Sequence, residues 1–315
     1  MPDFLQMGNA VLLAANVAAW LLLLVAWPGR TPRPWRLRLG WVLGLGAGFY
    51  AGCAVFKQWP RWPAPEDRDR FLVILLPLTL AVEIVAALVP RPRWLAWLLR
   101  LGVAGAAAPI LLYHSAYVAD LSGPNSAKWS STESVLIFFG LAAALLAVWG
   151  LLALLQARTS ERSAAPTLVL TALAAGVTVM LTGYFYGGLL GLILAGAIAG
   201  ATLASFAAPA PPDTGHYLGV GMIGLFTVLL SGHFFSDLPT STAVCLLLAP
   251  LLAWLPELPG PRRLLPSIRD AARFILVAVP LVFVVLNAEK KPTEAPATTP
   301  NEFDVTSDDY KSFGK

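Results

Sequence analysis

Charged residues are scarce in this chain. Asp, Glu, Lys and Arg make up only 13% of its 315 residues, whereas hydrophobic residues make up 57% and the mean hydropathy is +0.69. Because soluble domains carry about a quarter charged residues, this composition excludes an ordinary soluble globular protein. The apolar residues come in runs near the length that crosses a hydrocarbon core of about 30 Å. The sequence therefore predicts an all-α, polytopic integral membrane helix bundle.

Cysteine and the common catalytic motifs are also nearly absent. Cys53 and Cys245 lack CxxC spacing and both lie inside apolar runs, so we predict free thiols, with one disulfide between them as the alternative. The chain contains no Walker A sequence, no GxGxxG after a strand, no GxSxG and no CxxCH. These absences argue against ATP hydrolysis and c-type haem within this chain. We predict no cofactor and no bound metal.

The formal charge of +4 comes from Lys and Arg residues that lie between the hydrophobic runs. A nucleic-acid-binding protein would gather them on one basic face, so the predicted partner is the lipid bilayer and not nucleic acid. Arg exceeds Lys, and Ala and Leu dominate the apolar runs, a composition that hints at a bacterial source. We therefore expect a multi-pass protein of the cell membrane, in a bacterium the inner membrane.

Ten membrane spans are predicted within a transmembrane domain of residues 1–287. No Lys or Arg precedes the first apolar run, so we expect a retained helix rather than a cleaved signal. The ninth span is the weakest because it is short and contains Pro250, and a count of nine stays open. The ten spans are 4–27, 39–56, 71–89, 94–119, 135–156, 166–183, 187–207, 217–235, 242–256 and 271–287.

The distribution of arginines orients the predicted bundle. Most lie in the first, third, fifth and ninth connections, or at adjoining helix ends. The positive-inside rule then places the N-terminus outside, together with the C-terminus if ten spans are present. Residues 288–315 are polar and rich in Pro and Thr, which predicts a disordered tail. That tail is a candidate docking segment for a protein partner, although a flexible end without a role is the simpler prediction.

Two charged residues inside apolar runs are the first candidate site. Glu83 and Arg100 each lie six residues from the predicted turn at 90–93, so both are about 9 Å deep along their helices. Isolated charges at such depth are costly, which predicts a buried ion pair. The pair either clamps a helix hairpin or handles a solute or proton. A second alternative leaves Glu83 protonated while Arg100 reaches the headgroups alone.

Small residues mark two of the predicted helices at every fourth position. Gly44, Gly48 and Gly52 do so in the second span, and Gly196 and Gly200 in the seventh. Faces of this kind let helices approach closely in lipid. Spans one to five and spans six to ten form two five-helix halves, and the second and seventh spans are the second helix of each half. This arrangement allows an inverted repeat of the kind found in secondary transporters. Glu83 and Arg100 have no counterparts in the second half, which argues against the repeat.

Two further groups of polar residues are weaker candidates. Thr167, Thr171, Thr178 and Thr182 share one face of the sixth span; each hydroxyl is expected to bond the preceding turn, although a threonine stripe can line a wet path. At the predicted outer surface lie His114, Asp120, His233 and Asp237. If their helices are neighbours, these side chains form an outer cluster with acid-base or metal-binding chemistry. Trp20 and Trp149 lie deep in their spans and are predicted to be packing residues.

These features favour a small-solute transporter or permease, whose substrate the sequence does not identify. The span count, glycine-rich helices and intramembrane charges support it. A non-catalytic membrane subunit or scaffold is the first alternative, because polar residues are few in the spans. An intramembrane enzyme built on the outer cluster is the second alternative, and overall an enzyme is less expected than a non-enzyme.

Overall fold

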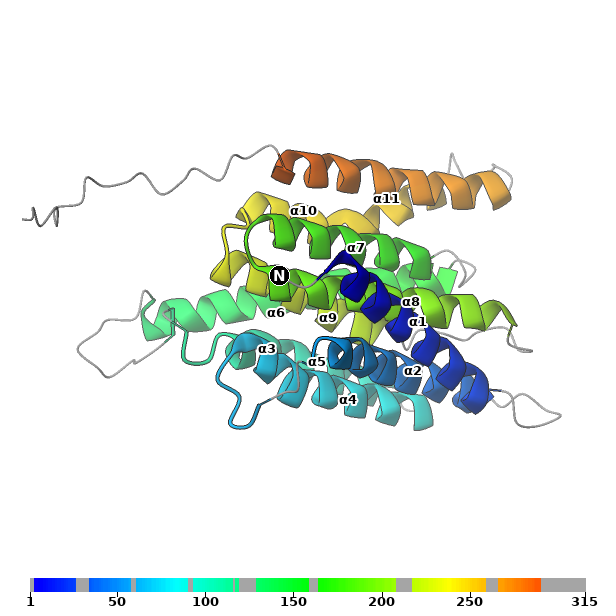
Figure 1. Ribbon diagram of the computed structural model, residues 1–315, viewed down its shortest axis with the longest axis horizontal. Helices are drawn as coiled ribbons and strands as arrows, with labels where there is room; N and C mark the ends of the chain where they lie inside the picture. Colours follow the sequence, from blue (N-terminus) through cyan, green and yellow to red (C-terminus); the bar gives the residue numbers. More distant parts are fainter. Residues whose placement is uncertain are drawn as a thin grey trace, which may run out of the picture.

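The computed structural model is a bundle of helices that run side by side along its long axis (Figure 1). It describes residues 3–26, 34–57, 61–89, 93–115, 117–118, 129–158, 164–207, 217–258 and 266–289, and these contain no strand. The helices are α1 Phe4–Ala26, α2 Pro34–Val55, α3 Asp67–Arg70, the π-helix η1 Phe71–Leu75, α4 Leu76–Leu88, α5 Arg93–Leu111, α6 Ser131–Arg158, α7 Ala164–Leu181, α8 Phe185–Ala207, α9 Tyr217–Phe235, α10 Thr240–Leu248, the 3₁₀ helix η2 Ala249–Glu257, and α11 Pro266–Glu289.

The predicted polytopic helical membrane bundle is confirmed. Within the described ranges, nine helical segments are long and apolar enough to cross a membrane, and α7 is a shorter apolar helix over Ala165–Leu181. Each of the ten predicted spans corresponds to one of these segments. The predicted ninth span is α10 continued by η2, and this segment, Thr240–Glu257, is one of the nine. Residues 290–315, most of the predicted tail, lie outside the described residues.

Two predicted boundaries were wrong, and both errors lie at the end of the bundle that carries α3, here called the α3 end. The fourth span ends at Leu111 rather than at residue 119, because the Arg70 guanidinium donates from Nη1 to the Leu111 carbonyl at 3.2 Å. The third helical stretch begins at Asp67 and runs without a break through η1 into α4. Residues 67–70, predicted to lie in a loop, are instead packed into the bundle, with Asp67, Asp69 and Arg70 buried.

Glycines and alanines fix how α1 packs. The stripe Ala10, Ala14 and Ala18 is fully buried and faces the glycine stripe of α2. A methyl group on Gly44 would lie 2.7 Å from the Ala18 carbonyl oxygen. The adjoining face of α1 meets the glycines of α8, where a methyl group on Gly196 would lie 2.7 Å from the Val11 carbonyl oxygen. Helix α1 is therefore held between α2 and α8 by close backbone contact, the expected use of small residues in lipid.

The same kind of contact joins α7 to α8. A methyl group on Gly176 would lie 2.7 Å from the Gly188 carbonyl oxygen, and one on Gly191 would lie 2.7 Å from the Gly176 Cα. In both five-helix halves, therefore, the first helix packs through small residues on the second helix. The second helices of the two halves, α2 and α8, also contact each other.

Two helices of the bundle depart from α geometry. In η1, the Leu76 amide donates to the Phe71 carbonyl, five residues earlier, and the Tyr50 hydroxyl of α2 donates to the Leu72 carbonyl at 2.6 Å. Tyr50 thus satisfies a carbonyl within the π-helix. The other departure is at Ala249, where α10 tightens into η2 just before Pro250, a residue that cannot donate its own backbone hydrogen bond.

The glycine contacts predict which enlargements the bundle tolerates. Gly44→Leu should lower the free energy of unfolding by about 1–3 kcal/mol or more, because its side chain would meet the α1 backbone. Gly105→Leu is the matched control on α5, where a methyl group would meet nothing within 4 Å, and it should stay near wild type. Thermal unfolding of the detergent-solubilised variants tests this. Equal destabilisation of the two variants would contradict the packing described here.

Candidate functional site

Glu83 of α4 and Arg100 of α5 form a two-pronged ion pair. The guanidinium donates from Nε to Glu83 Oε1 at 2.8 Å and from Nη2 to Oε2 at 2.7 Å. The Glu83 side chain has no exposed surface, and that of Arg100 is 11% exposed. Parallel donors of this kind match a carboxylate in both geometry and charge. The pairing predicted from the sequence is present, and its use as a binding site stays a prediction.

Two indole rings hold the Arg100 guanidinium. Its Cζ lies 5.3 Å from the ring centre of Trp97 and 5.4 Å from that of Trp149, and the two ring centres are 6.4 Å apart. Cations over indole faces are attracted by the ring quadrupole, more strongly where water is excluded. Trp149, predicted to be a packing residue, packs on this charge. Trp20, predicted likewise, is 66% exposed on the bundle surface, so that prediction was wrong.

The Glu83 carboxylate also lies against the second half of the chain. A methyl group on Gly219 of α9 would overlap the Glu83 carboxyl group, so only a glycine leaves room for it. Helix α9 is the third helix of its half, as α4 is of the first. The ion pair therefore lies where the central helices of the two halves meet. Sequence reasoning missed Gly219, because one glycine among several in α9 gives no signal on its own.

A second polar centre, at the α3 end, joins the same two helical stretches. Asp67 accepts the Tyr184 hydroxyl at 2.7 Å on Oδ1 and the Ser231 hydroxyl at 2.6 Å on Oδ2. Burial, together with the neighbouring Asp67 carboxylate, raises the pKa of Tyr184 well above its ordinary value of 10.0. Asp67 thus ties α3 to the loop before α8 and to α9.

The neighbouring charges of α3 face other partners. Arg70 donates to the carbonyls of Ala64, Pro65 and Leu111 at 3.3, 2.5 and 3.2 Å. Asp69 is 1% exposed, and neither of its carboxylate oxygens accepts a hydrogen bond; its partner is Arg68, at 3.7 Å. Sequence reasoning treated this charge run as a solvated loop. The available signal was its direct continuation into the apolar run at Phe71 without a helix breaker.

The opposite end of the bundle carries a third charged group. Glu257, at the end of η2, pairs with Arg273 and, at 3.5 Å, with Arg269 of α11. Arg273 also donates to Asp270 at 2.8 Å. Arg273 is 1% exposed, so this cluster ties α11 to η2. The sequence had suggested only that the two arginines orient the bundle.

The predicted outer cluster does not assemble among the described residues. His114 is exposed, with a positive φ of 52°, and its ring packs on Tyr113. His233 shares a hydrogen bond of 2.8 Å between Nδ1 and the Leu238 carbonyl, and Asp237 is exposed. Where the structure describes the chain, no three His, Cys, Asp or Glu side chains form a metal-binding group. Asp120, the remaining member, lies outside the described residues.

The threonine stripe follows its predicted packing role only in part. Thr171 donates to the Thr167 carbonyl at 2.8 Å, as expected one turn earlier. Thr182 donates to the Val179 carbonyl, three residues earlier, and lies 3.0 Å from the hydroxyl of Ser236, the residue after α9. The buried Thr178 hydroxyl makes no hydrogen bond. Both cysteines have free thiols, so the alternative of a Cys53–Cys245 disulfide was wrong.

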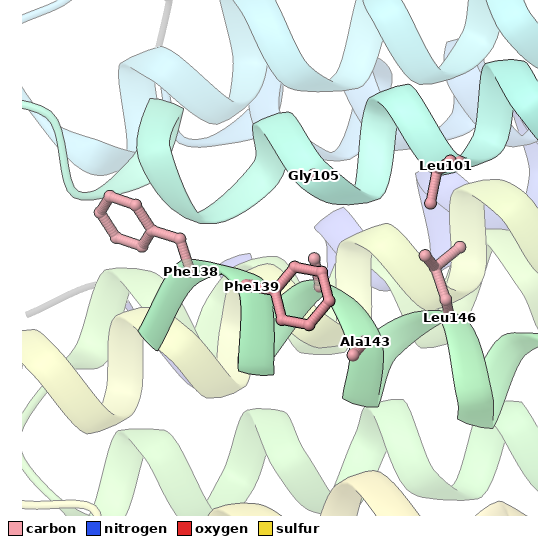
Figure 2. A pocket seen from close by; sticks show the side chains of 7 residues that line it. Leu101, Gly105, Phe138, Phe139, Ala143 and Leu146 are labelled. Carbon is pink, nitrogen blue, oxygen red and sulfur yellow. The ribbon is translucent and has the colours of Figure 1, made fainter. Parts of the chain in front are cut away.

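A pocket of about 420 Å³ lies between α5 and α6 (Figure 2). Phe138, Phe139 and Leu146 of α6 face Leu101 and Gly105 of α5 across it, and its lining also includes Ala142 and Ala143. These side chains offer no hydrogen-bonding group, so the pocket suits apolar matter such as acyl chains. It contains neither member of the ion pair.

Removing one member of the ion pair should lower the free energy of unfolding. Glu83→Gln or Arg100→Gln leaves a buried charge without its partner, which typically costs about 3–5 kcal/mol. The double variant leaves no such charge and should be more stable than either single variant. Thermal unfolding of the four proteins measures this coupling. Additive losses would show that the two side chains do not act as a pair.

The Asp67 hydrogen bonds predict two further effects. Ser231→Ala removes the donor to Oδ2 and should lower the free energy of unfolding by about 1–3 kcal/mol.

Because the Tyr184 pKa is raised, the stability that this group contributes is present below about pH 10 and is lost as the pH rises further. Wild type should therefore lose stability above about pH 10 more steeply than Tyr184→Phe. Unfolding temperatures against pH test this, with Tyr186→Phe as the exposed control; identical slopes would contradict it.

The chain was also compared with known proteins. No protein-family model and no curated protein matches it. Its function is therefore inferred from the geometry of its own residues.

Proposed function

We propose that this multi-pass helical membrane protein is a small-solute transporter. One observation carries the proposal: Glu83, fully buried and paired with Arg100, lies against Gly219, where the central helices of two five-helix halves meet. In secondary transporters built from repeats, substrates and coupling ions bind between the halves. Ionisable groups at such a depth generally mark a pathway or a binding site.

Similar packing in the two halves supports the proposal. The α1–α2 and α7–α8 interfaces both use small residues in backbone contact, and the pairs α2–α8 and α4–α9 join the halves through equivalent helices. The continuous helical stretch of α3, η1 and α4 is linked to α9 at the α3 end, where the Ser231 hydroxyl donates to Asp67. Near the other end of the same two helices, Glu83 lies against Gly219. A rocking motion of one half on the other would break and form these two contacts.

Irregular helices support it further. The π-helix η1 precedes α4, and α10 changes into η2 just before Pro250. Breaks of this kind concentrate at functional sites and in the discontinuous helices of transporters. They supply positions at which a helix can bend.

The orientation belongs to the same proposal. Arg36, Arg38, Arg158, Arg269 and Arg273 lie on helix ends opposite the α3 end. By the positive-inside rule, this opposite end faces the cytoplasm, and the N-terminus lies outside. The membrane is the cell membrane, in a bacterium the inner membrane. Any protein partner would dock on the C-terminal tail.

A static scaffold is the second candidate, and one observation favours it. Arg100 is held by a bidentate carboxylate and two indole rings at once, an arrangement that also suits a permanent clamp between α4 and α5. The two candidates differ in whether water ever reaches Glu83. A transporter must admit it from each side in turn, whereas a scaffold need not admit it at all.

Accessibility of a cysteine beside Glu83 separates these candidates. Ala86 is buried and lies one turn from Glu83 on α4. In a Cys53→Ser, Cys245→Ser background, Ala86→Cys should react with a charged, membrane-impermeant thiol reagent in both right-side-out and inside-out vesicles. Leu101→Cys, on the exposed surface of α5, is the control and should stay unlabelled because lipid excludes the reagent. Labelling of Ala86→Cys from one face only, or from neither, would contradict transport.

A further inference from the structure

We infer that the solute is a small carboxylate anion that enters together with one proton, its carboxylate replacing that of Glu83 on Arg100. This inference rests on the proposed transport function and names the substrate class of the same site. It begins from the charge of the site. The charges of Glu83 and Arg100 sum to zero, the Glu83 side chain is fully buried against α9, and that of Arg100 is 11% exposed.

Charge balance restricts what can enter such a site. A guanidinium stays protonated in proteins, so Arg100 always contributes one positive charge. An added cation would leave the site with one excess positive charge, and an anion alone with one excess negative charge. Both states are costly in a low-dielectric interior. An anion accompanied by a proton leaves the site neutral, because Glu83 becomes an uncharged carboxylic acid.

Geometry then selects a carboxylate among anions. Nε and Nη2 of Arg100 present two parallel donors, and Glu83 occupies both at 2.8 and 2.7 Å. The Glu83 carboxylate therefore marks where a substrate carboxylate would bind. Trp97 and Trp149 both lie against the guanidinium, so its donors keep their direction when the carboxylates exchange. Gly219 leaves the space that the Glu83 carboxyl group occupies.

The exchange balances in atoms and bonds. A proton from the aqueous phase adds to one Glu83 oxygen, and the two hydrogen bonds from Arg100 to Glu83 break. The substrate carboxylate then accepts two hydrogen bonds from the same donors. Helix α4 packs on α2, α5 and α9. Besides Arg100, the titratable or charged groups on these helices are Arg36, Arg38, Tyr50 and Cys53 of α2, Arg93 of α5, and Tyr217 and His233 of α9.

Binding of a simple probe to purified protein tests the inference. Acetate supplies the carboxylate alone, acetamide is its neutral isostere, and chloride is an anion without two parallel acceptors. In Glu83→Gln, the Arg100 charge lacks its carboxylate, so acetate should raise the unfolding temperature at every pH, more than chloride and far more than acetamide. Arg100→Gln should show no such response. Glu133→Gln, a change at an exposed carboxylate, should behave like wild type.

The wild-type protein should add a pH signature. Because one proton accompanies each anion, the Kd for acetate should rise roughly tenfold per pH unit where Glu83 is ionised in the free protein. Glu83→Gln should lack this slope. If acetate stabilises Glu83→Gln no better than chloride or acetamide, the inference is wrong. If that variant purifies only with acetate present, the result supports it; if it purifies with neither acetate nor acetamide, the inference is likewise overturned.

The two proposals can fail separately. Two-sided labelling of Ala86→Cys without an acetate response would leave transport standing and remove the carboxylate as substrate. An acetate response without two-sided labelling would keep the anion site but show that the protein does not transport through it.

Discussion

The pairing of the Glu83 and Arg100 charges among apolar helices is the constraint on which the rest of the structure depends. Two opposite charges placed deep in an apolar bundle satisfy each other, and every element nearby accommodates them. Helices α4 and α5 supply the charges, Trp97 and Trp149 cover the guanidinium, and α9 offers a glycine where any side chain would collide with the carboxyl group. In lipid, no surrounding water can replace these partners, so the local fold is fixed by the requirement to neutralise this pair.

Much of this arrangement followed from the sequence because lipid imposes simple rules. Hydrophobic run length gave the ten helical segments, and equal depth from a shared turn gave the contact between Glu83 and Arg100. The four-residue spacing of glycines predicted which helices pack closely, although not which helices they pack against. That α2 and α8 both pack on α1 depends on tertiary arrangement, which spacing along one helix does not encode.

The errors arose where the polarity of a segment does not predict whether its side chains are buried. The charged residues of α3 look like a loop by composition, yet Asp67 and Arg70 are buried because hydroxyls and carbonyls from distant segments surround them. The predicted outer cluster failed for the opposite reason. His114 and His233 lie at suitable helix ends, but each packs on an aromatic neighbour in its own segment. Proximity between helix ends depends on which helices are adjacent, and the spacing of residues along the chain does not encode which helices those are.

The 3₁₀ geometry of η2 also resolves how the weakest predicted span crosses the bilayer. As a continuous α-helix, the eighteen residues of Thr240–Glu257 would reach only about 27 Å. The nine residues of η2 rise about 2.0 Å each instead of about 1.5 Å. The segment therefore extends to roughly 31 Å, close to the thickness of the hydrocarbon core. Tightening the helical winding lengthens the rod, so a segment with few residues still reaches from one membrane surface to the other.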